Sequence, residues 1–495
     1  MAAAEILEAE QPPVTARGEL KPPIPIKLFY GFGQAIESGY LFVSALVFFY
    51  YTAVLGLSGS LVGLALAISM AVDAVFDPLI GSLSDNVRSK LGRRLPPMLI
   101  GAPLFAGALW LLFAPPTGLT PLLLFAWLTV CKLSLRGLAS LFNLPFFALG
   151  AEMADGYVER SSVVAYRTIA GIIVGVALTI LAYSVFFKGP GGLQSAERYP
   201  AFGLTVAALL LASAAICCAG IWRYVVRLPQ PTTPPRPLLR ALAPEVAEIF
   251  RNRSFRTLFL SALVVYVAAG LNAALNTYAY VFVWKLESGM IQTITFAYLI
   301  GIAIGVPVTP VLLRRMEKRS AVVLGLAIVI SSWIVLPSLR ASGLFMAAGA
   351  TALPWVAANV WWAGFGTGFL AIAYPSMMAD AADEHEVLFG SRREGLYFAG
   401  LGFANKAAGG LGALLGGVAL DLLKFPKEAG RQVGVILPES LQSHLMIAWG
   451  PAAAVLGVIA TLMLLPYAIS RVRHDDIAAR LKVKRANDVA EGRSS

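Results

Sequence analysis

Charged residues are scarce in this sequence, and their scarcity excludes most soluble folds. Only 14% of the 495 residues are Asp, Glu, Lys or Arg, whereas 58% are hydrophobic, and the mean hydropathy is +0.74. A soluble chain of this length rarely has such a composition. Apolar stretches of about 20 residues, long enough to cross the hydrocarbon core of a bilayer, recur along the whole chain. The sequence therefore predicts an all-α integral membrane protein.

Cysteine and histidine are rarer still, with three residues of each. Cys131, Cys217 and Cys218 lie inside apolar stretches and have neither the spacing of a metal site nor that of a disulfide framework. His385 and His474 lie in segments that we expect to be cytoplasmic. The sequence also has no nucleotide-binding loop and no acid cluster beside a nucleophile. We therefore expect a protein that is not an enzyme and that has no bound cofactor.

The basic residues alternate with apolar stretches in a pattern typical of membrane topology. The net charge is +11, yet Lys and Arg gather in every second connection, which argues against nucleic acid as a partner. The basic segments are Arg88–Arg94, Arg236–Arg256, Arg314–Arg319 and Arg471–Arg493. Because cytoplasmic loops are the basic ones, we expect both termini in the cytoplasm and an even number of spans in the inner (plasma) membrane. The first 27 residues have no apolar region before a cleavage site, so we expect no secretory signal.

The order of apolar stretches predicts twelve spans in two halves. The predicted spans are Leu28–Val54, Ser60–Leu83, Pro97–Ala114, Thr120–Leu149, Val163–Phe187, Ala201–Val226, Phe255–Trp284, Ile291–Leu313, Ala321–Leu339, Leu344–Met378, Gly395–Leu423 and Ser443–Ile469. Between the sixth and seventh, a Pro-rich, basic segment includes Leu238–Phe250, which we predict to be a short helix on the membrane surface. The predicted domains are a tail at 1–27, a six-helix bundle at 28–227, a cytoplasmic linker at 228–254, a second six-helix bundle at 255–470 and a tail at 471–495. This is the plan of the major facilitator fold, in which the solute binds between the bundles and is released by alternating access.

Acidic residues within the spans are candidates for a cation site, because a charge inside a membrane is costly unless it is paired or hydrated. Asp73 and Asp77 lie four positions apart, so both carboxylates share one helix face, and Glu37 lies in the neighbouring span. Three converging carboxylates would suit a hard monovalent cation such as Na+, or a proton relay. The alternative is that the acids pair with Lys406 and only hold the two halves together.

A polar stripe along the fourth span is a candidate solute site. Lys132, Arg136, Ser140 and Asn143 follow one another at helical spacing, with Phe147 beside them, and Tyr40 lies in the first span. If Lys132 and Arg136 face a cavity, they favour an anionic solute. The alternative is that these side chains extend to the membrane surface, which is easier for Lys132 than for the deeper Arg136.

A signature around the second span resembles one family. Asp73-Ala-Val-Phe-Asp77-Pro78-Leu-Ile-Gly81, then Ser84-Asp85 and Gly92-Arg93-Arg94, are similar to the glycoside–pentoside–hexuronide:cation symporters, the melibiose permease-like family of the major facilitators. Tyr50-Tyr51-Thr52, Leu144-Pro145-Phe146 and the segment from Arg392 to Lys406 extend the resemblance to both halves. The resemblance implies symport of a glycoside, pentoside or hexuronide with Na+ or H+.

The resemblance also implies roles for individual residues. Asp73 and Asp77 take the place of the principal cation ligands, which are metal ligands if the ion is Na+, with Glu37 as a further acid and Ser140 nearby, while Lys406 couples the halves. Asp85, Arg93 and Arg94 match the cytoplasmic gating loop of the major facilitators, and we add Arg167 to this gating group.

The resemblance fails at the sugar site. Asn143 stands where galactoside carriers of the family have an aspartate, Phe147 where they have a tryptophan, and Met70 where they have an arginine. A galactoside site is therefore not preserved. Because Lys132 and Arg136 add positive charge, an acidic sugar fits better than a neutral disaccharide. An alternative of the same fold is a cation-coupled transporter of lysophospholipids or other amphipathic anions. We expect the partners to be the solute, a monovalent cation and membrane lipids, and the protein to be a monomer.

Overall fold

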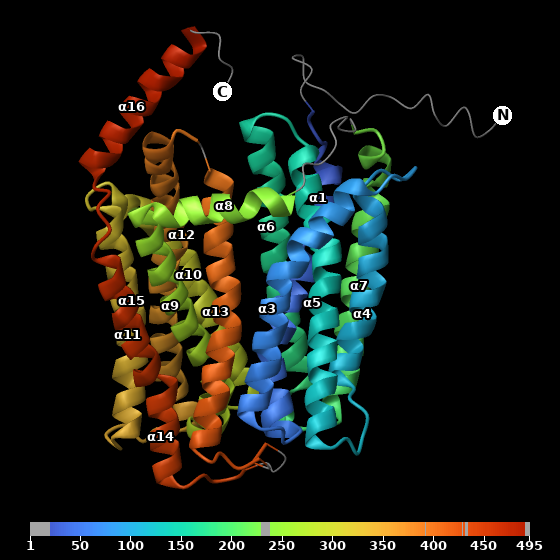
Figure 1. The fold of residues 1–495 in the computed structure, drawn as a ribbon. Helices are drawn as coiled ribbons and strands as arrows, with labels where there is room; N and C mark the ends of the chain where they lie inside the picture. Colours follow the sequence, from blue (N-terminus) through green and yellow to red (C-terminus); the bar gives the residue numbers. More distant parts are fainter. Residues whose placement is uncertain (1–19, 229–237, 392, 428, 431–433, 491–495) are drawn as a thin grey trace, which may run out of the picture. The chain divides into compact units, whose positions relative to one another are not determined.

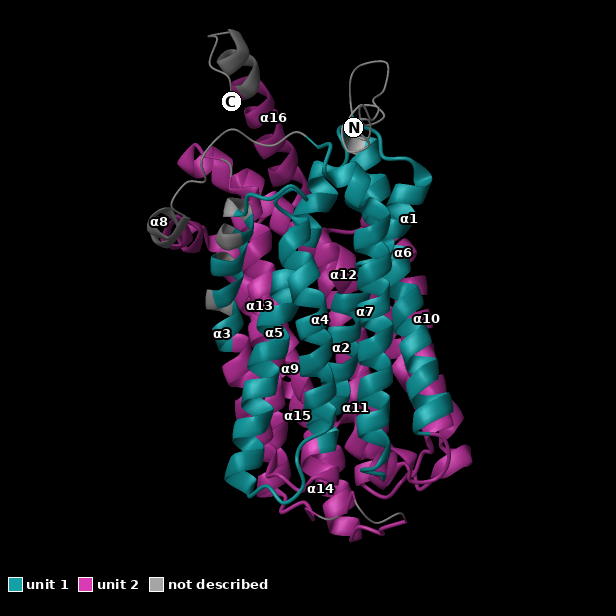
Figure 2. Ribbon diagram, turned by 90° about the vertical axis from the view of Figure 1, so that its right-hand side faces the viewer, with its two compact units in different colours: residues 1–50, 71–187, 195–238 teal, residues 51–70, 188–194, 239–495 magenta. Residues whose placement is uncertain are grey.

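The protein is helical throughout the residues that its computed structural model describes, namely 20–228, 238–391, 393–427, 429–430 and 434–490 (Figure 1). The chain divides into two compact units (Figure 2). The first unit comprises residues 1–50, 71–187 and 195–238, and the second comprises 51–70, 188–194 and 239–495. Segments 51–70 and 188–194 thus belong to the second unit, although they precede the linker in sequence.

The first unit contains the helices of the N-terminal half. They are α1 (Ile24–Phe32), α2 (Ala35–Phe49), the second half of α3 (Gly59–Asn86), α4 (Leu95–Phe113), α5 (Pro121–Glu152), α6 (Tyr157–Ile180) with a π-helical end at Leu181–Phe186, and α7 (Arg198–Val225). An aromatic core lies among them, where the ring of Tyr50 stacks on Tyr199 at 4.0 Å between centroids. Phe113 packs against Phe202 in an edge arrangement at 5.7 Å.

The second unit contains the remaining helices. They are the first half of α3 with the π-helical turn Tyr50–Val54 before it, a 3-10 turn at Gly192–Gln194, α8 (Leu238–Arg251), α9 (Arg253–Tyr278) with a π-helical end at Ala279–Val283, α10 (Ser288–Leu313), α11 (Lys318–Ala341), a 3-10 turn at Gly349–Thr351, α12 (Leu353–Phe389), α13 (Glu394–Leu422), α14 (Glu439–Trp449), α15 (Pro451–Leu464) and α16 (Arg471–Ala490). The predicted short helix in the linker is confirmed as α8. The core of the second unit includes a buried contact between Ser261 and Tyr374, whose hydroxyl oxygens lie 2.7 Å apart.

The helices agree with most of the predicted spans. Within the described residues, eleven helical stretches are long and apolar enough to cross a membrane. α1, α2 and the turn to Val54 form the first of them, and α14 with α15 forms the last. α3 occupies the predicted second span as a continuous helix of 28 residues, but its apolar part, Gly59–Asp73, is shorter. The all-α architecture is confirmed for the described residues, and the count of twelve spans stays a prediction.

The predicted bounds of the tenth span were wrong. Instead of Leu344–Met378, the helix α12 covers Leu353–Phe389. Gly343 and Gly349 have positive φ angles, so the apolar segment between them turns instead of continuing a helix. At the other end, charged residues stop the apolar pattern but not the helix, because Asp380 accepts from Lys318 at 2.7 Å and Glu384 from Arg473 at 2.5 Å. Hydropathy alone therefore ended this span too early.

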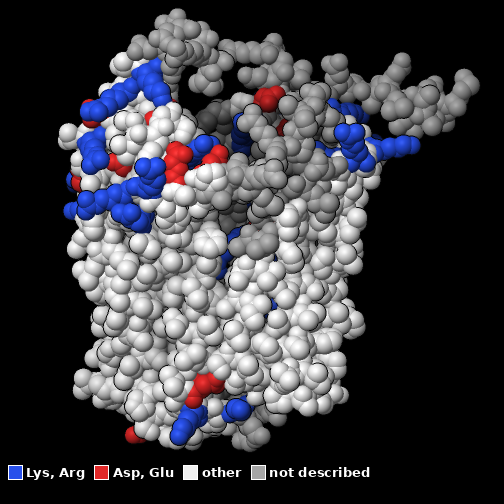
Figure 3. Space-filling view, in the orientation of Figure 1, with Lys and Arg blue, Asp and Glu red and all other residues white. Residues whose placement is uncertain are grey.

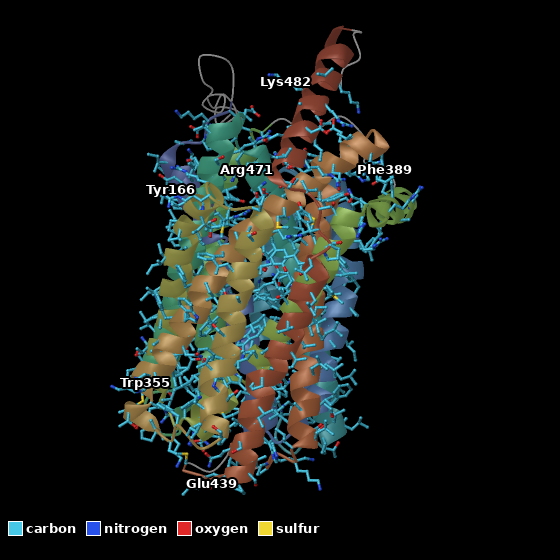
Figure 4. The ribbon with its side chains drawn as sticks, turned by 90° about the vertical axis from the view of Figure 1, so that its left-hand side faces the viewer. Tyr166, Trp355, Phe389, Glu439, Arg471 and Lys482 are labelled. Atoms are coloured by element: carbon cyan, nitrogen blue, oxygen red, sulfur yellow. The ribbon has the colours of Figure 1, made fainter. Side chains whose placement is uncertain are left out.

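The surface charges lie toward the two ends of the helices, with the larger group at one end. Figure 3 shows Lys and Arg side chains around the end that carries α8, and an almost uncharged surface along the middle of the helices. Figure 4 places Arg471 and Phe389 near this basic end, whereas Trp355 and Glu439 lie at the opposite end. This distribution is typical of helices whose middle faces lipid.

The break between α1 and α2 places the polar face of α2 beside α5. Tyr30, at the end of α1, stacks on Phe146 at 4.4 Å, and its hydroxyl donates to the Phe146 carbonyl at 2.9 Å. A side chain at Gly150, one turn further along α5, would collide with the hydroxyl of Tyr30. α1 is thereby fixed on α5, and α2 then follows the polar stripe of that helix.

Candidate cation and solute site

Three helices of the first unit supply the predicted site residues. α2 carries Glu37 and Tyr40, α3 carries Asp73 in the half that belongs to this unit, and α5 carries the stripe from Lys132 to Asn143. Lys132, Arg136, Ser140, Asn143 and Asp73 are all buried, with exposed fractions between 1% and 6%. The stripe thus faces the interior, and extension of Lys132 or Arg136 to the membrane surface is excluded.

Asp73 forms the central ion pair of the site. Nη2 of Arg136 lies 2.6 Å from Oδ2 of Asp73, and the hydroxyl of Ser140 donates to Oδ1 at 3.3 Å. The aspartate is 1% exposed and the arginine 6%. A buried carboxylate without a partner is costly, and the guanidinium together with the hydroxyl compensates this one. The sequence had assigned Arg136 to the solute, whereas the structure places it against the predicted cation ligand.

Glu37 and Lys132 each have a neutral hydrogen-bond partner. Nδ2 of Asn143 donates to Oε2 of Glu37 at 2.6 Å. Nζ of Lys132 donates to the hydroxyl of Ser44 at 2.9 Å and lies 4.7 Å from the centre of the Tyr40 ring. Among the described residues, no carboxylate pairs with Lys132. Its ammonium is therefore a buried cation that is stabilised by a hydroxyl and an aromatic face, not by a counter-charge.

The predicted convergence of three carboxylates into one cage is not found. The described residues contain no group of three His, Cys, Asp or Glu side chains that could hold a metal ion. Asp73 is instead engaged by Arg136 and Glu37 by Asn143, because a nearby donor lowers the cost of a buried carboxylate more than a second carboxylate would. Asp77 lies one turn along α3 from Asp73 and is half-buried.

Several buried polar atoms of the site have no hydrogen-bond partner within the described part of the chain. They are the hydroxyl of Tyr40, Nε of Arg136 and Oδ1 of Asn143. Buried polar atoms in native proteins nearly always have a partner, and exceptions are frequent where water or a ligand binds. A phenol, a guanidinium and an amide oxygen together offer both donors and acceptors, which is what a hydroxyl-rich or acidic solute requires.

The remaining predicted residues lie at other places. Lys406 is on α13 in the second unit, so its predicted coupling role stays a prediction. Phe147 follows the stripe on α5, and its ring lies 4.8 Å from the guanidinium carbon of Arg167. Arg167, a predicted gating residue, thus contacts a predicted solute residue.

The predicted gating arginines converge on an acid that the sequence analysis missed. Nη2 of Arg93 and Nη2 of Arg94 lie 2.6 and 2.7 Å from Oε1 of Glu152, the last residue of α5. Arg94 also donates to the Ser84 hydroxyl at 3.3 Å. The side chain of Asp85 lies outside the described residues. Glu152 follows the end of the fourth apolar stretch, and an acid at that position was the available signal.

Two other functional candidates were missed. Ser44, which binds Lys132, has no sequence signal that distinguishes it from other serines in apolar spans. Asp421, in the second unit, accepts from the backbone amides of Gly59 and Ser60, both at 2.9 Å. It therefore caps the first turn of α3, and an acid inside the predicted eleventh span could have drawn attention to it.

Comparison with known proteins shows which proteins the chain resembles along most of its length. Residues 29–471 match the family described as MFS/sugar transport protein. An uncharacterized symporter of Synechocystis sp. is 26% identical over 93% of this chain and 97% of its own length. The isoprimeverose transporter of Lactiplantibacillus pentosus is 24% identical over 78% of each chain. The glucuronide carrier protein homolog of Escherichia coli is 25% identical over 75% of this chain and 78% of its own.

Solved structures show the same fold. The nucleoside transporter NupG aligns with a TM-score of 0.61 at 15% identity, over 89% of this chain and 98% of that one. A bacterial homolog of the human lysosomal transporter Spinster aligns with a TM-score of 0.58 at 12% identity, over 90% and 98% of the two chains. These relatives and neighbours are transporters and not enzymes.

Proposed function

Since the chain belongs to the MFS/sugar transport protein family, the glycoside–pentoside–hexuronide symporters of the major facilitator superfamily, we propose that it carries an acidic sugar together with one monovalent cation. The coarse function, cation-coupled symport of sugars or glycosides across a membrane, follows from the family and its named relatives. The acidic sugar and the single cation are inferred from the charges of the first unit.

The charge balance of the site supports binding of one cation. Glu37, Asp73 and Asp77 contribute three formal negative charges, while Lys132 and Arg136 contribute two positive ones. The acids of these helices thus exceed the bases by one formal charge, and a charge in a low-dielectric region is costly unless it is balanced. A bound Na+ or a proton on one carboxylate would neutralise it. Sequence and geometry support either ion, because carboxylates serve both.

The pair of Arg136 and Asp73 supports a mechanism for coupling. The same carboxylate is engaged by Arg136 and is a predicted ligand of the cation. We propose that a cation at Asp73 and Asp77 replaces the guanidinium, and that the released Arg136 then binds the carboxylate of the solute. The cation would displace Arg136 from Asp73, and the solute would keep Arg136 away from Asp73. Cation and solute would therefore each favour the binding of the other, as symport requires.

Lys132 carries the argument for an acidic solute. It is 1% exposed and, among the described residues, has no carboxylate partner, although it lies in the polar stripe. An ammonium in such a place gains more from an anionic solute than from a neutral one. The hydroxyl of Tyr40 and Oδ1 of Asn143 would then bind sugar hydroxyls. A named relative, the glucuronide carrier protein homolog, agrees with a hexuronide as the solute class.

The rest of the cycle follows the family plan. We propose that both termini are cytoplasmic, that Lys406 couples the halves, and that the cluster of Arg93, Arg94 and Glu152, together with Asp85 and Arg167, acts as the inner gate. The protein would work as a monomer in the inner membrane, among lipids, without a resident cofactor and without nucleic acid as a partner.

Thermal unfolding of the detergent-purified protein tests this proposal. The panel contains hexuronides, neutral glycosides and a lysophospholipid, each with and without Na+ at constant ionic strength and at two pH values. We expect stabilisation by a hexuronide that depends on Na+ or on pH, and a weaker effect of the matching neutral glycoside. Stabilisation by the lysophospholipid alone would contradict the sugar assignment and favour an amphipathic anion. Equal effects of acidic and neutral sugars would contradict the role of Lys132.

A further inference from the structure

Another buried arginine lies in the second unit, at the end opposite α8. Arg340, in the last turn of α11, is 9% exposed. Its guanidinium donates to neutral acceptors: Sδ of Met346 at 2.9 Å, Oε1 of Gln442 at 3.2 Å, and the carbonyls of Val283 at 3.4 Å and Phe345 at 3.5 Å. Within the described residues it forms no salt bridge, and its buried Nε has no hydrogen-bond partner.

A small cavity opens beside this guanidinium. It has a volume of about 60 Å³ and is lined by Arg340, Gly343 and Met346 together with Glu439, Gln442 and Ser443 of α14. A single water needs about 10–15 Å³ of such space, whereas pockets for drug-sized ligands measure about 300–1,000 Å³. The cavity therefore has room for a small ion or a few waters and is too small for a sugar.

The start of α14 adds a second attraction for negative charge. α14 has 11 residues, and its N-cap, Pro438, has no side chain that could accept from the amides of the first turn. These amides and the helix dipole favour an anion at this end. The hydroxyl of Ser443 is a further donor at the cavity wall. These donors share the cavity wall with one carboxylate, that of Glu439 in the first turn of α14, and one of the donors is a buried, permanently charged guanidinium.

We propose that Arg340 and the N-terminus of α14 bind a small monovalent anion of the halide class. Among the described residues Glu439 attracts the buried guanidinium without forming a salt bridge with it, so a bound anion would supply a counter-charge in direct contact. Glu439 lies at the mouth of the same cavity but is exposed, so water screens its charge. The carboxylate of Glu439 weakens anion binding but does not take the place of the anion. This site lies outside the proposed coupling site and does not depend on the identity of the solute.

The test is thermal unfolding of the full-length protein in potassium chloride and in potassium gluconate at equal ionic strength. We expect the wild-type unfolding temperature to rise with chloride and to saturate, as binding to the folded state requires. The Arg340→Gln variant should lose the chloride dependence. Glu439→Gln should shift the half-saturating chloride concentration about fivefold lower, because a nearby like charge is removed.

Three outcomes decide the proposal. A wild-type protein that unfolds at the same temperature in both salts would overturn it, and so would a chloride response that Arg340→Gln leaves unchanged. If Arg340→Gln does not fold, Glu439→Gln decides the matter alone. Tighter chloride binding supports the site, whereas unchanged or weaker binding means that Glu439 itself is the counter-charge of Arg340.

Discussion

Replacing Arg136 with Gln removes the guanidinium that faces Asp73 and leaves a carboxylate that is 1% exposed. Loss of one partner of a buried ion pair costs about 3–5 kcal/mol, because the remaining charge stays desolvated. Ser140 still donates to the other carboxylate oxygen, which places the expected loss near the lower end of this range. We therefore expect Arg136→Gln to lower the free energy of unfolding by about 3 kcal/mol.

A double-mutant cycle separates the pair from its surroundings. Asp73→Asn alone leaves the buried guanidinium without its counter-charge, and the double variant Asp73→Asn with Arg136→Gln leaves two neutral amides. We expect the double variant to be more stable than the sum of the single losses predicts, by a coupling of about 2–3 kcal/mol. Thermal or denaturant unfolding in detergent measures the coupling. Lys132→Gln is the matched control, since it also removes a buried cation from α5 but breaks no salt bridge.

The affinity of Arg136→Gln for the coupling ion is a second measurement, and here a gain is expected where stability shows a loss. If Arg136 competes with the cation for Asp73, Arg136→Gln should bind the coupling ion more tightly than the wild type, although it transports an acidic sugar poorly. Lys132→Gln should leave ion affinity close to the wild-type value and weaken the acidic sugar. A coupling below about 0.5 kcal/mol, or weaker ion binding in Arg136→Gln, would refute the exchange mechanism.

Three further results are expected. Asn143→Leu should abolish binding of the sugar and destabilise the protein by about 1–3 kcal/mol, because Glu37 loses one of its partners. Asn143→Gln should retain part of the binding and part of the stability, and equal losses in the two variants, measured by ligand-induced thermal shifts, would contradict the contact. Glu152→Gln should lower the free energy of unfolding by no more than about 1 kcal/mol, since the pairs with Arg93 and Arg94 are partly exposed. The same variant should make a cysteine introduced in the inner part of α5 more accessible to thiol reagents, and unchanged labelling would exclude a gate. Gly150→Ala should lower the free energy of unfolding by about 1–3 kcal/mol, because the added methyl group collides with the Tyr30 hydroxyl. Adding Tyr30→Phe should recover part of this loss in an unfolding assay, whereas additive losses would show that the hydroxyl is not the obstacle.

The sequence predicted the spans well because hydropathy and helix length are local properties. A run of apolar residues longer than the bilayer is thick leaves few alternatives to a helix. The prediction failed at α12, where the decision depended on distant partners: Asp380 and Glu384 continue the helix as residues paired with Lys318 and Arg473. Such pairs join α12 to other helices, and no local pattern contains them.

The candidate site could be predicted only as a set of helix faces. Spacing alone placed Lys132, Arg136, Ser140 and Asn143 on one side of α5, and all four are buried there. The rotation of α5 against α2 and α3 was not available from spacing, so neither the pair of Arg136 with Asp73 nor that of Asn143 with Glu37 was expected. Both pairs join residues from different helices, more than sixty positions apart in the chain.

These pairings change which residue supports an acidic solute. Counting charges along α5 gives two equivalent cations, and the sequence had favoured Arg136 because a guanidinium grips a carboxylate with two bonds. In the structure Arg136 is already engaged by Asp73, while Lys132 has a hydroxyl and an aromatic ring as its neighbours. The ammonium is therefore available to a solute from the start, whereas the guanidinium becomes available only when something else neutralises Asp73. If that agent is the transported cation, the order of events follows from electrostatics, since the second cationic group is released to the sugar only after the ion has bound.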